Sequence, residues 1–315
     1  MRKIIVIGES VLDTLYGVDG QPVKTMVGGR IANATASLGL TGLPVCFCSE
    51  CCTDVVGDLI VDFFSRHQVS TKSIDRYTDG STRLSAIFQQ PDGSLKVVNY
   101  GSYPAADRFN VVWPRIDEGD IVIFGSLYAI DAPQRQRVYE LLTYAAERKA
   151  VMVNLPGFHH DANFRITRVL TAILENLEHS SVVVAHERDL AEIFPGEDAA
   201  AAYRNHIEYY CPCFIHMLAS GGIEAFVGKE HWTFEGEVAQ NWLGWESGFT
   251  AGVTCGLLQE GITAEQVSTI TRDTMGRIIH TALEWARSAK QESNCIDEAL
   301  AKQARKAIDE APKED

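Results

Sequence analysis

Short apolar runs alternate with longer amphipathic stretches along the chain, and this alternation restricts the possible folds more than any other feature. Strands buried in a parallel sheet are apolar throughout, whereas the connecting helices show one apolar face. The pattern predicts an α/β fold with a mostly parallel sheet flanked by helices. The strands are expected at 3–7, 45–48, 121–124, 151–154, 182–185 and 214–218, and the helices at 31–40, 55–67, 133–149, 199–209, 248–259, 264–288 and near 296–308.

Two segments break this alternation. Residues 14–26 are interrupted by glycine and have a β-like pattern, and residues 82–100 are typical of a hairpin that turns at Pro91-Asp92-Gly93. Neither segment has a helix to cover it, so we expect their strands to form a small sheet that projects from the main domain. No linker divides the chain. Residues 1–315 are therefore predicted to form one domain into which the two segments are inserted.

The charge of the chain excludes some partners. With 28 basic and 42 acidic residues, its formal net charge is −14. Nucleic acids and anionic membranes bind positive surfaces, so neither is expected as a partner. The apolar run at residues 4–7 is too short for a signal peptide, and no apolar stretch of about 18 residues is present. These features predict a cytoplasmic protein.

The eight cysteines do not have the spacing of a zinc site. Cys46, Cys48, Cys51 and Cys52 cluster, whereas a structural zinc site needs two separated CxxC-like pairs. Cys46 and Cys48 belong to a run that is typical of a buried strand. Reduced thiols that pack as small apolar groups explain them, and no metal site is predicted.

A set of polar and glycine residues near the N-terminus suits a ligand with several hydroxyl groups. Asp13, expected at the end of a strand, can accept two hydrogen bonds, and Asn33 offers a donor and an acceptor. Gly28 and Gly29 would let the backbone approach a ligand closely. A loop aspartate, a glycine turn and a helix-capping asparagine are the structural alternatives. The combination of all four in this order favours contact with a sugar.

The same segments resemble the PfkB/ribokinase family of carbohydrate kinases. IGESVLD resembles the opening strand of the family, whose acidic residue, here Asp13, holds sugar hydroxyls, and VGGRIANATASLGL resembles its first signature. Asp54 and Gly57 match the Asp-x-x-Gly that follows, and residues 82–100 occupy the place of the lid hairpin. The resemblance extends to about Leu258 and is more specific in the N-terminal half. It implies a ribokinase-like fold with a small β-sheet lid, a sugar substrate, and ATP and Mg²⁺ as cofactors.

The second signature of the family is degenerate in this chain. Family members have Asp-Thr-x-Gly-Ala-Gly-Asp-x-Phe, whose glycine turn binds the moving phosphoryl group and whose last aspartate is the base. Here Gly244 keeps the first glycine, Trp245 and Glu246 replace the next two residues, and Ser247 replaces the base. Loss of a general base costs on the order of 10²–10⁴ in rate. We expect residues 244–247 to form a loop that enters a helix near Gly248, with Trp245 or Glu246 in the space of the phosphate.

The nucleotide side has also changed. Where relatives carry an Asn-x-x-Glu linked to magnesium, this chain has His186 and Asp189. Gly222 remains from the glycine positions of this side. The resemblance implies that Asp189 and Gly222 contact the nucleotide, and it gives no metal ligand.

Three functions are compatible with this combination. The first is a sugar-binding protein of the kinase family in which ATP-dependent phosphoryl transfer is impaired or lost. The second is an active carbohydrate kinase with a substitute base, for which Glu246 is the nearest carboxylate, although it points about 100° away from Ser247 on a helix. The third is a scaffold without a ligand. An exposed edge of the small sheet also predicts a homodimer through these sheets.

Overall fold

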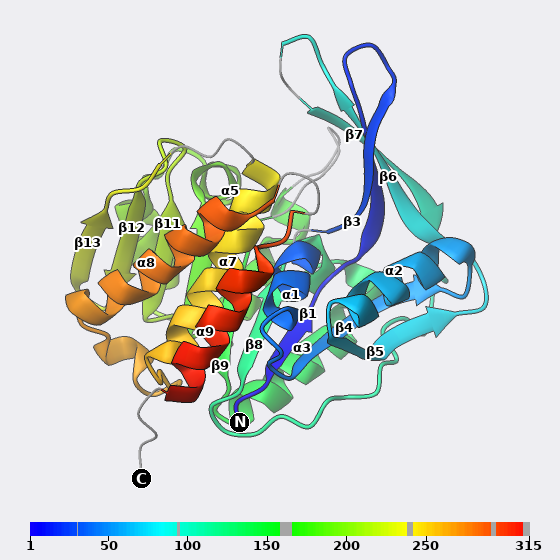
Figure 1. Ribbon diagram of the computed structural model, residues 1–315. Helices are drawn as coiled ribbons and strands as arrows, with labels where there is room; N and C mark the ends of the chain where they lie inside the picture. Colours follow the sequence, from blue (N-terminus) through cyan, green and yellow to red (C-terminus); the bar gives the residue numbers. More distant parts are fainter. Residues whose placement is uncertain (30, 93–94, 158–165, 238–241, 291–293, 311–315) are drawn as a thin grey trace.

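The computed structural model describes residues 1–29, 31–92, 95–157, 166–237, 242–290 and 294–310. Its strands form a nine-stranded sheet in the order β13-β12-β11-β10-β9-β8-β1-β4-β5 and a four-stranded sheet in the order β3-β2-β6-β7 (Figure 1). None of the helices in these ranges combines the length and apolar character needed to cross a bilayer.

The large sheet is built around the fully buried strand β1 (Ile4–Ile7), which pairs in parallel with β4 and β8. The predicted apolar strands are all present, and the sheet is mostly parallel, as expected. The sequence pattern missed β5 and the antiparallel strands β12 and β13, and both β5 and β13 carry polar, partly exposed residues. The other strands of this sheet are β4 (Val45–Cys52), β5 (Val69–Tyr77), β8 (Ile121–Gly125), β9 (Val151–Leu155), β10 (Val182–His186), β11 (Cys213–Met217), β12 (Ile223–Val227) and β13 (Glu230–Phe234).

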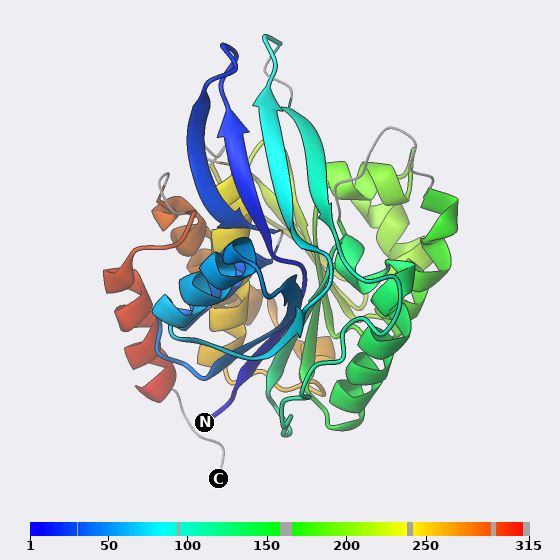
Figure 2. The same ribbon diagram turned by 90° about the vertical axis from the view of Figure 1, so that its right-hand side faces the viewer.

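Helices cover both faces of this sheet (Figure 2). One layer packs its apolar side chains on the sheet through the largest core cluster, and the other layer through two smaller clusters. The first layer contains α1 (Ala32–Gly39), α2 (Val55–Arg66), α7 (Trp242–Gln259), α8 (Arg272–Ser288) and α9 (Glu298–Glu310), and the second contains α3 (Ala132–Glu147), α4 (Leu170–Glu178), α5 (Glu187–Ile193) and α6 (Ala199–Ala202).

Two predicted helices away from the second signature differ from those observed. The helix expected at 199–209 ends as α6 after Ala202 and continues as a π-helical turn over Tyr203–Ile207. Tertiary packing explains this turn, because the side chains of Tyr203 and Ile207 are both buried. The helix expected at 264–288 begins only at Arg272, since Gln266 accepts from the backbone N–H of Thr263 within a separate turn.

Glycines spaced by four residues allow α7 and α8 to pack closely. A Cβ atom at Gly252 would lie 2.5 Å from Cα of Ala282, and one at Gly248 would lie 2.9 Å from Cα of Ala286. Real Cβ atoms do not approach a backbone this closely, so the two helices can pack this way only because these positions are glycine.

Gly252→Ala is therefore expected to destabilise the protein by about 1–3 kcal/mol, the usual effect of overpacking a core. Gly276→Ala on α8 is the matched control, because its new methyl group would only make an ordinary 3.5 Å contact with Phe234. That substitution should be neutral or stabilising, since alanine has the higher helix propensity. Urea unfolding of both variants measures the difference. A Gly252→Ala variant as stable as the wild type would contradict this account of the packing.

The two segments that broke the βα pattern form the small sheet, as predicted. Its strands are β2 (Val11–Tyr16), β3 (Pro22–Gly28), β6 (Ser81–Gln89) and β7 (Leu95–Ser102). Strand β2 pairs antiparallel with β3 and in parallel with β6, and the sheet extends away from the large sheet (Figure 1). The assignment of the whole chain to one domain stays a prediction.

All eight cysteines are free thiols, and only Cys46 is partly exposed. Burial raises the pKa of Cys211 and of Cys51 to about 12, so these thiols stay protonated near neutral pH. Within the described ranges, no group of three His, Cys, Asp or Glu side chains is arranged to hold a metal ion.

Candidate functional site

The site lies where the carboxyl ends of β1 and β8 meet the base of the small sheet, the usual ligand position in α/β folds. Glu9 follows β1 and Ser126 follows β8, and the Ser126 hydroxyl donates a hydrogen bond to the Glu9 carboxylate. Ser126 has φ 55° and ψ −171°, a conformation that is strained for any residue other than glycine. Strain of this kind is typical of functional sites. The sequence analysis missed both residues.

Asp13 lies within β2 rather than at the end of a strand, which corrects the expectation from the sequence. Its partner is the hydroxyl of Ser85, directly opposite on β6. The pKa of Asp13 is raised to about 7, mainly because the carboxyl group is buried. The hydrogen bond with Ser85 opposes this shift, and the charge of Glu9 adds to it. No basic side chain of the described residues forms an ion pair with Asp13. Its carboxyl group can therefore both donate to and accept from a ligand near neutral pH.

The two glycines bring Glu9 and Asp13 together. A side chain at Gly28 would collide with the Asp13 carboxylate, and one at Gly29 would collide with the backbone carbonyl of Glu9. Gly29 also has φ +114°, which other residues rarely adopt. The glycines thus allow the strands to meet closely beside the acidic pair.

Asn33 lies in the first turn of α1 and is 6% exposed. Its side-chain oxygen Oδ1 is buried and has no hydrogen-bond partner in the described part of the protein. A buried polar atom without a partner costs about 1–3 kcal/mol. A hydroxyl group of a ligand would satisfy it. A ligand shared by Asp13, Gly28, Gly29 and Asn33 stays a prediction.

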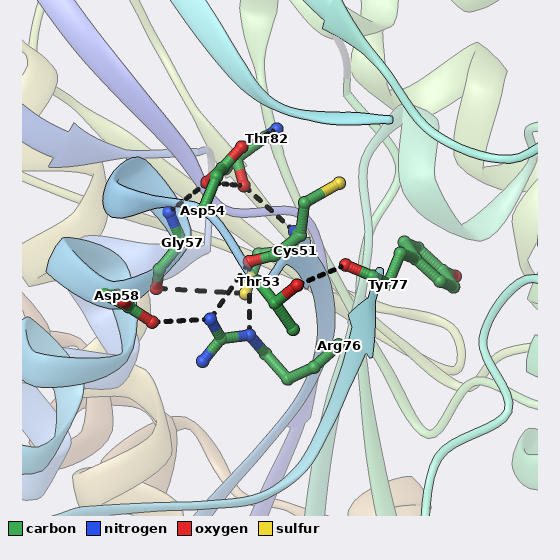
Figure 3. A network of polar contacts seen from close by, with 9 residues as sticks. Cys51, Thr53, Asp54, Gly57, Asp58, Arg76, Tyr77 and Thr82 are labelled. Carbon is green, nitrogen blue, oxygen red and sulfur yellow. Dashed lines mark hydrogen bonds and ion pairs between the residues drawn. The ribbon is translucent and has the colours of Figure 1, made fainter. Parts of the chain in front are cut away.

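Asp54 joins the small sheet to the main domain (Figure 3). One of its oxygens, Oδ1, accepts from the N–H of Gly57 at 2.8 Å and so caps α2. Asp54 also accepts from the backbone N–H and the hydroxyl of Thr82, both at 2.7 Å. Burial alone would raise the pKa of Asp54, but the bonds from Thr82 and Gly57 outweigh it and lower the pKa. Asp54 is therefore a structural anchor for the base of β6.

A buried ion pair, Glu50 with Arg108, lies next to this anchor and was also missed by the sequence analysis. Both side chains are at most 4% exposed. The Tyr77 hydroxyl donates to Glu50 at 2.7 Å, and the guanidinium of Arg108 lies 5.3 Å from the ring centre of Tyr103. These contacts fix the loop that follows β7.

The degenerate signature forms part of a helix, not the predicted loop. Helix α7 begins at Trp242, about a turn and a half before the expected entry at Gly248. Trp245, Glu246 and Ser247 lack the conformational freedom of a glycine turn and are compatible with a helix, which explains the difference. An α-helix bonds each N–H to the carbonyl four residues earlier, so the N–H groups of Glu246 and Ser247 are taken up by the helix.

Trp245 and Glu246 have different environments. Trp245 is 7% exposed and stacks on Phe249 with ring centres 5.3 Å apart, so it belongs to the hydrophobic core. The Glu246 carboxylate is 2.6 Å from the guanidinium of Arg188, and the side chain of Glu246 is 14% exposed. Ser247 is 6% exposed. The position of the family's base is therefore a buried serine next to a paired carboxylate.

The two residues assigned to the nucleotide lie in turns. Asp189 accepts from the backbone N–H of His186 at 3.0 Å, and the His186 side chain accepts from the N–H of Arg188 at 3.2 Å, so both cap α5. Gly222 lies between β11 and β12, where its carbonyl accepts from Leu218 at 2.9 Å. Contact of Asp189 or Gly222 with a nucleotide stays a prediction.

A family model described as pfkB family carbohydrate kinase matches residues 1–208, about two thirds of the chain. The chain belongs to this family. The matched residues include Glu9, Asp13, Gly28, Gly29 and Asn33, and they end before α7. The PfkB assignment therefore rests on the part of the chain that precedes α7 and includes the candidate sugar site.

Solved PfkB-like structures have the same fold. A fructokinase from Xylella fastidiosa with bound ATP superimposes with a TM-score of 0.77 at 18% identity, covering 98% of this chain and 99% of that one. An uncharacterized sugar kinase from Pyrococcus horikoshii gives 0.75 at 15% identity, covering 97% and 99%. The aminoimidazole riboside kinase of Salmonella enterica, complexed with aminoimidazole riboside and an ATP analog, gives 0.72 at 14%, covering 98% and 100%. No curated protein sequence matches significantly. The fold is thus that of ribokinase-like kinases.

Proposed function

We propose that this PfkB protein binds a sugar or related metabolite beneath the small sheet and that its ATP-dependent phosphoryl transfer is impaired or lost. The sugar part of the proposal is supported by two groups, each of which lacks one kind of partner among the described residues: the protonatable Asp13, which lacks a cation, and the buried Oδ1 atom of Asn33, which lacks a hydrogen bond. Both groups need a polar ligand that can donate and accept hydrogen bonds, as the hydroxyl groups of a sugar do.

The observation that carries the loss of transfer is the ion pair between Glu246 and Arg188. Catalysis of phosphoryl transfer requires donors or cations aimed at the moving phosphate. At the N-terminal end of α7, the guanidinium of Arg188 could have bound the phosphate, but Glu246 neutralises it. The N–H groups of Glu246 and Ser247 are bonded within the helix. A serine in place of the base cannot remove the proton of a sugar hydroxyl at neutral pH.

ATP and Mg²⁺ are the cofactors implied by the family. The residues at α7 do not fit the γ-phosphate, because a carboxylate and a closed helical turn replace the glycine turn. On the nucleotide side, Asp189 is 3% exposed and already caps α5. We therefore propose that ATP and Mg²⁺ bind weakly and without productive turnover.

An active kinase that uses Glu246 as a substitute base is the alternative. The contact with Arg188 argues against it, because a neighbouring cation makes a carboxylate a weaker base.

A homodimer through the small sheets and a cytoplasmic location belong to the proposal as well. Exposed Val23 on β3 and Val97 on β7 support the dimer, and free thiols support a reducing compartment.

A thermal-shift screen of sugars and nucleotides, with and without Mg²⁺, tests this function. A sugar at about 100 times its Kd should add roughly 2.7 kcal/mol of stability, whereas ATP with Mg²⁺ should add little. A scaffold without a ligand would show no sugar-dependent shift. A large ATP shift that depends on Mg²⁺ would instead favour an active kinase.

A further inference from the structure

One arginine at the base of the small sheet, Arg83, stands out because it has no acidic partner among the described residues. No carboxylate of the described residues forms an ion pair with Arg83, whose guanidinium carbon lies 5.1 Å from the ring centre of Tyr103. Other arginines around the site are neutralised: Arg76 pairs with Asp58, Arg108 with Glu50 and Arg188 with Glu246. In a chain with 42 acidic and 28 basic residues, an unpaired and partly buried arginine requires an explanation.

A β-bulge orients this side chain. Ser81 pairs with Ser102 and Leu84 with Tyr100, so Thr82 and Arg83 together oppose the single residue Gly101. A Cβ atom at Gly101 would lie 3.0 Å from Cα of Arg83, which explains why this position is glycine. Bulges often redirect a side chain beside an active site.

The bulge places Arg83 on the face of the sheet that carries the site. Gly101 and Asn99 are two residues apart on β7 and share a face, so the residues opposite them share it as well. Asn99 pairs with Ser85, and Ser85 pairs with Asp13. The hydroxyl oxygen of Ser85 also lies 2.7 Å from Oδ1 of Asn99. Arg83 therefore continues the polar row of Asp13, Ser85 and Asn99 toward the main domain.

Charge separates the two ends of this row. The carboxyl group of Asp13 lies at one end, whereas the guanidinium of Arg83 at the other end attracts an anion. Residues two apart on a strand are separated by about 7 Å, which is comparable with the length of a pentose or hexose. Arginine binds carboxylate and phosphate groups through two parallel hydrogen bonds.

We infer that the ligand of this site is an anionic sugar, a sugar acid or a sugar phosphate, whose charged group binds Arg83 while its hydroxyls bind Asp13 and Asn33. The inference rests on the proposed sugar-binding function and names its substrate class. The competing explanation is a purely structural role, in which Arg83 only stacks on Tyr103. The affinity for the ligand depends on the charge of the ligand in the first explanation and not in the second.

Matched ligand pairs test the inference by titration calorimetry: fructose with fructose 6-phosphate, and glucose with gluconate. In the wild type, at least one anionic sugar should bind at least about 10-fold more tightly than its neutral counterpart, the effect of roughly one charge-assisted contact. Arg83→Gln should remove this preference and leave the affinity for the neutral sugar unchanged. Arg66→Gln, on the exposed face of α2, is the control and should change neither. Melting temperatures establish that the variants are folded.

Several results would overturn the inference. Equal affinity for neutral and anionic sugars in the wild type would do so, and so would an Arg83→Gln variant that loses both equally, as a structural role predicts. Inorganic phosphate alone that binds as tightly as the sugar phosphate would show a phosphate site instead of a sugar site. If no sugar of either kind binds the wild type, the proposed function fails as well. Neutral binding without anionic preference leaves that function intact.

Discussion

Purified protein supplied with ATP, Mg²⁺ and a sugar that it binds is expected to turn over about 10²–10⁴-fold more slowly than kinases, whose typical rates are 1–100 s⁻¹. The physical reason is the end of α7, where Ser247 replaces the base and Glu246 neutralises Arg188. A coupled assay of ADP release, with sugar phosphate identified by mass spectrometry, measures the rate. A turnover near 1 s⁻¹ or above would contradict the loss of activity.

Variants at the same positions separate the missing base from the closed phosphate site. Ser247→Asp alone should remain inactive, because the Glu246–Arg188 pair and the helical turn persist. The combination Trp245→Ala, Glu246→Gly and Ser247→Asp restores the family residues and leaves Arg188 without its partner, so some activity is expected. Trp245 is buried, and its replacement by alanine costs about 3–5 kcal/mol. Glu246→Gly with Ser247→Asp keeps this tryptophan and is the control for lost stability.

Asp13→Asn is expected to abolish the sugar-dependent thermal shift and, at pH 8, to stabilise the protein without ligand. Burial raises the pKa of Asp13 from 3.8 to about 7, so the folded protein holds this proton more tightly than the unfolded chain. Folding stability therefore falls as pH rises from about 4 to about 7 and is lowest above 7. The difference corresponds to an unfavourable free energy on the order of 4 kcal/mol at pH 8. Asparagine carries no charge, so the variant does not have this unfavourable free energy.

Melting temperatures of the wild type and Asp13→Asn between pH 4 and pH 8 measure the effect. The variant should melt several degrees higher at pH 8, and the difference should vanish near pH 4, where both side chains are neutral. Asp62→Asn, at an exposed position of α2, should show no such difference. An Asp13→Asn variant that melts at or below the wild type at pH 8 would mean that the Asp13 carboxylate is stabilised in the fold.

The sequence predicted most of the fold well, because the features that mark its strands are local. The apolar runs gave β1, β4, β8 and the other predicted strands of the large sheet, and the two segments without helices gave the small sheet. Glycines and polar residues at fixed spacing marked Asp13, Gly28, Gly29 and Asn33. The remaining partners, Glu9, Ser85 and Ser126, carry no local signal, because they reach the site from three separate strands or strand ends.

The chain order of apolar, polar and glycine residues was sufficient to determine the α/β fold, its family and the altered residues of the second signature. Tertiary structure alone decided what those alterations do. Trp245 extends α7 because it stacks on Phe249 within the core, and Glu246 meets Arg188 from a helix 58 residues away. Likewise, Arg83 lies on the same face of the small sheet as Asp13 only because a bulge in β6 places it there. Burial, pairing of charges and the register between strands depend on residues distant in sequence, so the local pattern could not contain them.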